Sequence, residues 1–257
     1  MTKNRKIIIS SFLLTVLFVT NQFFQGNEKY IAIAILGIFV ALTFYWSLKE
    51  GINLNATLLT FILPIFFSIG SGLFWLLLPA NIITRILVVI SFLVGIYAIF
   101  KTENIFTVAV MRRIPLTRAA KGIGFALTLT TCSFIMGTIF SFRREIFFNG
   151  ILVFLLSFPL FLQGYWSSLL TLNIPKKLII WSLVSSFSLA QVALVLYFWP
   201  ISVFVASLFL TICVYVALGL GQLELEERLF FQNIREYLVI GILVFFIIFI
   251  FGARWGG

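Results

Sequence analysis

Residues 178–220 decide the fold, and they read LIIWSLVSSFSLAQVALVLYFWPISVFVASLFLTICVYVALGL. This stretch is 43 residues long and contains no charged side chain. An α-helix rises 1.5 Å per residue, so about 20 apolar residues cross the hydrocarbon core of a bilayer. Pro200 lies near the middle of the stretch and interrupts helical hydrogen bonding. The stretch therefore predicts two membrane-spanning helices with a turn at Pro200.

The composition of the whole chain points the same way. Of its 257 residues, 62% are hydrophobic and 10% are charged, whereas soluble domains carry about a quarter charged residues. These values exclude a soluble fold and intrinsic disorder, and two cysteines exclude a disulfide-stapled secreted fold. The apolar runs do not alternate with polar residues, so helices rather than a membrane β-barrel are expected.

The same length criterion locates the remaining spans. The sequence predicts an all-α polytopic transmembrane helical bundle of about nine spans, forming one integral membrane domain over residues 1–257 with no soluble domain. The predicted spans are Ile7–Phe24, Tyr30–Leu48, Ala56–Leu78, Ile82–Phe100, Gly122–Phe142, Ile146–Leu170, Leu178–Phe198, Ile201–Leu220 and Tyr237–Phe251. The first run resembles a signal peptide in its basic start, but it lacks a cleavage site of small residues and is read as an uncleaved span.

The basic residues predict the orientation, because Lys and Arg concentrate in cytoplasmic loops. With the N-terminus in the cytoplasm and nine spans, 13 of the 18 Lys and Arg residues fall on the cytoplasmic side. The C-terminus is then outside. The net charge of +10 is thus explained by topology and anionic lipid, and nucleic acid is not an expected partner.

Missing residue types exclude several chemistries. The chain has no His, its eight acidic residues are all Glu, and no ionisable residue lies near the middle of a predicted span. Proton relays need such a residue, and haem, zinc or a Ser–His nucleophile usually needs His. No cofactor or metal is therefore expected, and the balance is against an enzyme.

Two cytoplasmic segments are candidate binding regions. The first is the basic loop with Arg112, Arg113, Arg118 and Lys121, which favours anionic headgroups or, as an alternative, one specific phospholipid or a partner. The preceding residues Ile105–Met111 are expected to lie along the membrane interface. The second is Gln222–Tyr237, which predicts an amphipathic helix with an ion pair between Glu224 and Arg228. This helix is either a connector or a surface for a membrane protein partner.

A third candidate lies on the predicted outer face, where Arg85, Arg143 and Arg144 occur. If their guanidinium groups converge, they bind a phosphate-bearing lipid, because the guanidinium fork matches phosphate oxygens. If they fan out around the rim, each contacts a different lipid. The sequence leaves both arrangements open.

Small residues and aromatic residues give further expectations. Ala120, Gly124, Thr128 and Cys132 recur every four residues and predict a helix-packing face, as do Ser182, Ser186 and Ala190. Cys132 and Cys213 are expected to be free thiols. Aromatic belts at the interfaces are expected to include Trp46, Trp75, Tyr165, Trp166, Tyr197, Trp199 and Tyr237.

Two stretches resemble known families. Lys101–Val108, followed by Arg112–Lys121, resembles a stretch in an uncharacterised family of polytopic bacterial membrane proteins of unknown function. It covers about 20 residues, and it implies a bacterial plasma membrane but no activity. Glu226-Glu227 resembles the paired glutamates of membrane-embedded prenyl endopeptidases, but the His residues of that family are missing, so proteolysis is not expected.

Three functions remain open. The leading interpretation is a non-catalytic scaffold or accessory subunit of a membrane complex. The second is a transporter or transferase that handles a lipid or isoprenoid phosphate, and the third is a passive carrier or channel. A fully packed bundle would favour the first function, whereas a polar cavity that reaches one face would favour the second or third.

Overall fold

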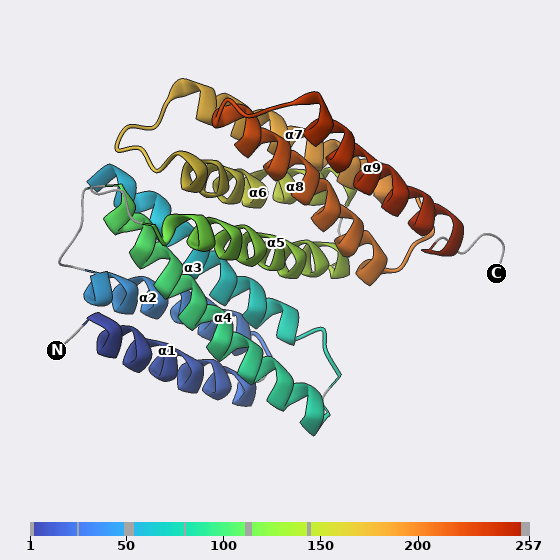
Figure 1. The fold of residues 1–257 in the computed structure, drawn as a ribbon. Helices are drawn as coiled ribbons and strands as arrows, with labels where there is room; N and C mark the ends of the chain where they lie inside the picture. The colour runs from blue at the N-terminus through green and yellow to red at the C-terminus, as the bar shows by residue number, and fades with distance from the viewer. Residues whose placement is uncertain are drawn as a thin grey trace. The chain divides into compact units, whose positions relative to one another are not determined.

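The computed structural model describes residues 3–24, 26–48, 54–79, 81–110, 115–142 and 145–252. Nine α-helices occupy most of this part of the chain (Figure 1): α1 (Lys3–Thr20), α2 (Glu28–Leu48), α3 (Leu54–Trp75), α4 (Ile82–Ala109), α5 (Thr117–Ser141), α6 (Ile146–Leu169), α7 (Lys176–Tyr197), α8 (Val203–Leu225) and α9 (Phe231–Ile247). A 3-10 turn, Asn21–Phe23, follows α1, and a π-helical turn, Ile248–Gly252, follows α9.

Each of these helices is long and apolar enough to cross a membrane, so the described residues contain nine candidate spans. The prediction of an all-α bundle with about nine spans is therefore confirmed. The predicted turn at Pro200 is also confirmed, because α7 ends at Tyr197 and α8 begins at Val203.

The chain divides into two compact units, with the boundary inside α5. The N-terminal unit contains Met1–Thr131 and Leu170–Asn173, and the C-terminal unit contains Cys132–Leu169 and Ile174–Gly257. In the N-terminal unit, α1 packs on α2, α2 on α3, α3 on α4, and α4 on α1, so the four helices close a ring.

Aromatic rings fill the interior of this ring of helices. The rings of Phe18 and Phe92 stack with centroids 4.2 Å apart, and the Phe44 and Phe100 rings meet edge to face at 5.0 Å. The Phe67 ring lies so close to Gly95 that a side chain at residue 95 would collide with it. Because lipid tails are as apolar as these side chains, close packing rather than escape from water holds such helices together.

The C-terminal unit is built differently. Helices α6, α7 and α8 pack on one another, and α9 packs on α8. Glycines bring the helices of this unit together: Leu194 of α7 packs over Gly150, and Leu218 of α8 packs over Gly164. On α8, Tyr165 packs over Gly221 and Tyr237 packs over Gly219. The described residues of α9 include no buried side chain.

The structure corrects the predicted end of the fourth span. Residues 101–109 were expected to be a loop with an interfacial piece over Ile105–Met111, but α4 continues without a break to Ala109. No Pro or Gly interrupts this segment, and Thr102, Glu103, Phe106 and Thr107 bury their side chains. Because the side chains of Thr102, Glu103 and Thr107 are buried, this polar segment stays part of α4. Met111 lies outside the described residues.

The structure also corrects the segment Gln222–Tyr237. It is not one amphipathic helix: α8 ends at Leu225, and α9 begins at Phe231. Glu227 has a φ of 58°, in the left-handed region, and this conformation ends the helix. The predicted pair between Glu224 and Arg228 does not form either. Glu224 instead pairs with Lys177 of α7 at 3.0 Å, and Arg228 lies 3.8 Å from Glu226.

The predicted packing faces are confirmed. Ala120, Gly124, Thr128 and Cys132 are all buried, as are Ser182, Ser186 and Ala190. Cys132 and Cys213 are free thiols, as expected.

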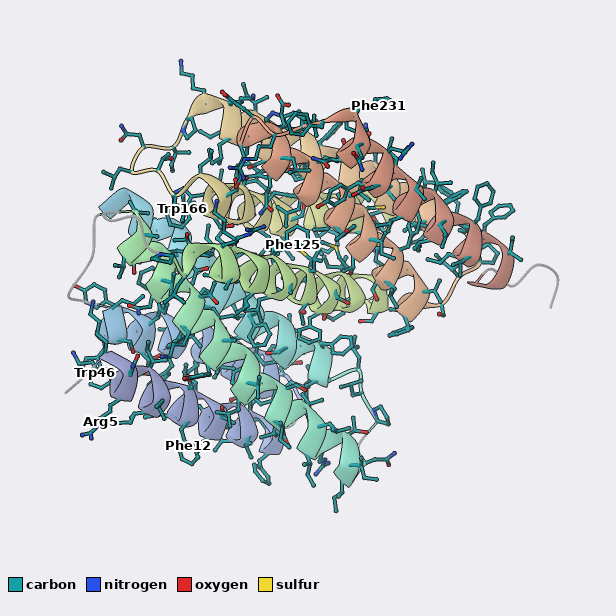
Figure 2. The ribbon with its side chains drawn as sticks, in the orientation of Figure 1. Arg5, Phe12, Trp46, Phe125, Trp166 and Phe231 are labelled. Atoms are coloured by element: carbon teal, nitrogen blue, oxygen red, sulfur yellow. The ribbon has the colours of Figure 1, made fainter. Side chains whose placement is uncertain are left out.

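The predicted aromatic belt is wrong at two positions. Tyr165 and Trp166 have no exposed surface, and Figure 2 labels Trp166 on α6. The close approach of Gly221 to Tyr165 explains why this ring fits inside the unit. Trp46 and Tyr197 are 45% and 42% exposed, as belt residues should be.

Candidate functional site

A cavity of about 670 Å³ lies at one end of the C-terminal unit, where four helices begin or end. Helix α5 contributes Phe140 near its end, α6 contributes Asn149 from its first turn, and α7 contributes its last residues. The complete lining is Phe140, Asn149, Leu196, Tyr197, Trp199, Pro200, Ile201, Ser202, Val203 and Ala206. The volume is typical of small-molecule binding sites.

The connection between α7 and α8 forms one wall because its sequence cannot remain helical. Pro200 has no backbone N–H, and the chain turns around it through hydrogen bonds from Trp199 N to Leu196 O and from Ile201 N to Trp199 O. Ser202 then caps α8: its hydroxyl oxygen accepts a hydrogen bond from Val205 N at 3.3 Å. Seven of the lining residues, 196–197 and 199–203, are therefore held at one end of the unit.

Trp199 brings a buried donor to this wall. Its ring packs against Phe245 and Phe249, with centroids 5.8 and 5.5 Å away. Its indole Nε1 is shielded from solvent and has no hydrogen-bond partner among the described residues. A buried donor without an acceptor costs about 1–3 kcal/mol, so this side chain is placed at a cost to stability.

The start of α8 adds further donors. The Ser202 cap satisfies Val205 N, and Ala206 N bonds to Ser202 O at 2.9 Å. The amides of Val203 and Phe204 belong to the first turn and have no partner within the helix. The amino end of a helix also carries a partial positive charge. This end of the cavity therefore favours a ligand group that accepts hydrogen bonds.

The rest of the lining is uncharged. None of the ten lining residues carries a charge at neutral pH, and six of them, Phe140, Leu196, Pro200, Ile201, Val203 and Ala206, are apolar. Asn149 is 5% exposed and contributes an amide. The cavity thus combines backbone donors and the hydroxyls of Tyr197 and Ser202 with apolar side chains.

The basic residues predicted as lipid sites lie elsewhere or outside the described residues. Arg85 is exposed on the first turn of α4, and Arg118 is exposed on the first turn of α5. Lys121 is half-buried on α5. Arg112, Arg113, Arg143 and Arg144 lie outside the described residues, so the convergence of the outer arginines stays a prediction.

Sequence reasoning missed two features. The first is the cavity, although Trp199-Pro200 followed by Ser202 signals a capped turn at a membrane interface. The second is Glu103, whose side chain has no exposed surface on the extended α4. The only signal for it was the absence of a helix breaker after Phe100.

Several polar groups inside the C-terminal unit pair across helices. The Tyr165 hydroxyl donates to Ala217 O at 3.0 Å and lies 2.6 Å from Ser185 Oγ, and Gln222 Nε2 donates to Gly164 O at 2.9 Å. These bonds join α6, α7 and α8 and explain why polar residues are tolerated there. They serve packing and leave the cavity as the candidate site.

A family described as a protein of unknown function, DUF5656, matches residues 11–251 of the chain. The chain belongs to this family. The resemblance to an uncharacterised family is thereby confirmed. The nine apolar helices of the described residues indicate an integral multi-pass membrane protein. No curated protein and no solved structure matches the chain.

Proposed function

We propose that this integral membrane protein handles a lipid, which it binds in the cavity at the α7–α8 turn. The observation that carries the proposal is the cavity itself, whose lining combines hydrogen-bond donors with apolar side chains. Its position where four candidate spans begin or end supports a site at the level of lipid headgroups.

The uncharged lining favours binding over chemical conversion. Cleavage or transfer of a lipid group needs an activated nucleophile or a general acid and base, and the lining offers only the hydroxyls of Tyr197 and Ser202, with no carboxylate, amine or imidazole to activate them. We therefore propose a lipid-binding or lipid-carrying role rather than a transferase.

A filled cavity tests the proposal. Val203 lines the cavity and is partly exposed, so Val203→Trp should occupy the space without disturbing the core. Phe204 is the next residue and is 66% exposed, so Phe204→Trp is a matched control. Native mass spectrometry of the purified proteins should show lipid loss in the first variant alone. Equal lipid retention in both variants would contradict the proposal.

The leaflet depends on the predicted orientation, with the N-terminus in the cytoplasm of a bacterium. In that orientation the cavity faces the outer leaflet of the plasma membrane. A reagent that cannot cross the membrane should label Arg144→Cys and spare Lys177→Cys in intact cells. The opposite labelling pattern would move the cavity to the cytoplasmic leaflet.

The basic residues remain a separate proposal for anionic lipid. Arg85, Arg143 and Arg144 would hold a phosphate only if they converge, and Arg112, Arg113, Arg118 and Lys121 would contact cytoplasmic headgroups. The triple Arg→Gln variant at 85, 143 and 144 should lose bound anionic lipid if the outer group is a site. Unchanged retention at equal thermal stability would eliminate it.

A role as an accessory subunit is the second candidate, and the exposure of α9 favours it. Within the described residues of α9 no side chain is buried, and Phe231 at its start is 82% exposed (Figure 2). A photo-crosslinking residue at Ile242, which is 54% exposed, would form a discrete protein adduct if a partner covers this helix. Adducts with lipid alone would remove this candidate.

A further inference from the structure

We infer that a groove along α1 holds one anionic phospholipid, with its headgroup on Arg5 and Lys101 and an acyl chain between two rows of side chains. The site lies in the N-terminal unit, so it goes beyond the cavity of the proposed function and does not depend on it. Neither cation belongs to the basic residues that the sequence predicted as lipid sites.

The groove has a volume of about 590 Å³ and lies on the exposed side of α1. Two rows at a spacing of four residues line it: Ile8, Phe12, Val16 and Thr20 form one row, and Ile9, Leu13 and Leu17 form the other. Side chains at this spacing form parallel ridges on a helix. The groove is apolar even at Thr20, because the hydroxyl of Thr20 donates to Leu17 O at 2.8 Å. From its first to its last residue α1 rises about 18 Å, and the hydrocarbon of one leaflet is about 15 Å thick. The groove therefore matches the length of one acyl chain.

Arg5 lies at the start of the groove because it continues one of the two rows, four residues before Ile9. Figure 2 shows Arg5 and Phe12 projecting from the same side of α1. Arg5 is exposed, and no residue that the structure describes forms an ion pair with it. Its guanidinium group is therefore available to a ligand whose acyl chain lies in the groove.

Asn4 continues the other row and brings a second cation to the same place. Its Oδ1 accepts a hydrogen bond from Lys101 Nζ of α4 at 2.9 Å. The same ammonium lies 5.8 Å from the centroid of the Tyr97 ring. An ammonium group has three donors, and Asn4 uses one of them. Lys101 is thus held beside the start of the groove with donors left for a phosphate.

The charge at this end of the N-terminal unit is positive. The first turn of α1 adds Lys3 and Lys6 to the two cations already described. Of the glutamates that the structure describes in this unit, Glu28 starts α2 at the opposite end, and Glu103 has no exposed surface. Cations of this kind attract anionic headgroups, and the guanidinium fork matches phosphate oxygens. A zwitterionic headgroup would place an ammonium group among them. A second copy packed in parallel through α1 would bring two sets of cations together, so a lipid is the favoured occupant.

Photoactivatable lipids test the assignment. The purified protein is placed in nanodiscs with phosphatidylglycerol or phosphatidylcholine that carries a diazirine in the middle of one acyl chain, and labelled residues are mapped by mass spectrometry. Arg5→Gln combined with Lys101→Gln removes two charges and keeps amide donors. The matched control is Lys176→Gln combined with Arg235→Gln, which removes the same charge from exposed positions on α7 and α9.

We expect phosphatidylglycerol to label residues 8–20 about tenfold more than phosphatidylcholine, because each cation near the headgroup strengthens binding several-fold. The variant at residues 5 and 101 should lose this preference, and the control should keep it. High salt should reduce the preference in wild type, since the cations are exposed. Equal labelling by both lipids in wild type, or a preference that survives the loss of both cations, would show that only bulk lipid covers α1 and would overturn the inference.

Two further arms keep the result clear. Arg5→Gln alone retains the contact between Lys101 and Asn4, so it should lower the preference several-fold without loosening α1 from α4, and no change would overturn the assignment. A photo-crosslinking residue at Phe12, which is 63% exposed, should form adducts with lipid. An adduct of twice the chain mass would assign the groove to a second copy and overturn the lipid assignment. Val203→Trp should leave the labelling of α1 unchanged, so failure of the cavity proposal is distinguishable from failure of this one.

Discussion

The N-terminal unit and the C-terminal unit are both built from membrane-length helices, but they enclose those helices to different degrees. In the N-terminal unit, α1 to α4 close a ring whose interior holds stacked aromatic rings. In the C-terminal unit, three helices form the interior, α9 lies on one of them, and one end contains a cavity. Because lipid solvates apolar side chains as well as protein does, a helix stays peripheral unless close packing or hydrogen bonds favour burial.

The contrast suggests a division of roles. A ring of four helices with interlocking aromatic rings has little room for a ligand, whereas helix ends that meet around a Pro200 turn leave space and unsatisfied backbone donors. The variants below test this contrast, beginning with those expected to have the largest effects.

The largest effect is expected for Gly95→Leu in the N-terminal unit. The Phe67 ring occupies the position of any side chain at residue 95, so the substitution must separate α3 from α4. Overpacking of this kind costs about 3 kcal/mol. The thermal midpoint of Gly95→Leu, measured by fluorescence-detected size exclusion, should therefore fall below that of wild type. Gly122→Leu is the control, because no atom lies within 4 Å of the added Cβ. An equal fall in the thermal midpoint of both variants would contradict close packing between α3 and α4.

The next effect is expected for Tyr165→Phe in the C-terminal unit. The substitution removes the hydroxyl that contacts Ser185 Oγ at 2.6 Å and Ala217 O at 3.0 Å. Two interhelical hydrogen bonds in a membrane protein contribute about 1–2 kcal/mol together. Unfolding in increasing SDS should shift by that amount. Tyr45→Phe, at a 48% exposed position, should leave the transition unchanged. A stability equal to wild type would show that the polar interior of this unit is dispensable.

Residues 178–220 illustrate how much could be predicted. Their length and lack of charge required two spans, and Pro200 located the turn between α7 and α8, because these features follow from bilayer thickness and local backbone chemistry. The cavity beside that turn could not be predicted, since it depends on where Phe140 and Asn149 of two other helices come to lie. Tyr165 was misassigned for the same reason: a sequence reports that a residue is amphipathic, but not that a glycine of another helix, here Gly221, faces it.

Glu224 shows the limit for charged residues. Its spacing from Arg228 matched a helical ion pair, but helix α8 ends before Arg228 and Lys177 of α7 lies closer. Helical spacing predicts only partners within the same helix. It does not reveal a partner on another helix, such as Lys177, which pairs with Glu224.

A smaller effect is expected for the hydrogen bond between α1 and α2. Ser10 Oγ lies 3.0 Å from Ser47 Oγ, whereas Ser11 Oγ donates to Ile7 O within its own helix. Interhelical bonds in membranes average about 0.6 kcal/mol in double-mutant cycles. A cycle of Ser10→Ala and Ser47→Ala should give a coupling of about that size, and a cycle of Ser11→Ala and Ser47→Ala should give none. Equal couplings would mean that the ring gains nothing from this contact.

The smallest effect is expected for the ion pair between α7 and α8. Lys177 Nζ lies 3.0 Å from Glu224 Oε1, but the two side chains are 53% and 31% exposed. Water screens such a pair, so its contribution is about 0.2–1 kcal/mol and falls as salt rises. A double-mutant cycle of Lys177→Met and Glu224→Gln should give a coupling near the lower value at low salt, measured by SDS unfolding. The cycle of Glu224→Gln with Arg228→Met should give none, because Arg228 lies beyond the end of α8. A larger coupling of Glu224 to Arg228 than to Lys177 would support one continuous amphipathic helix over this segment. It would also show that the Lys177–Glu224 pair does not help to join α7 to α8.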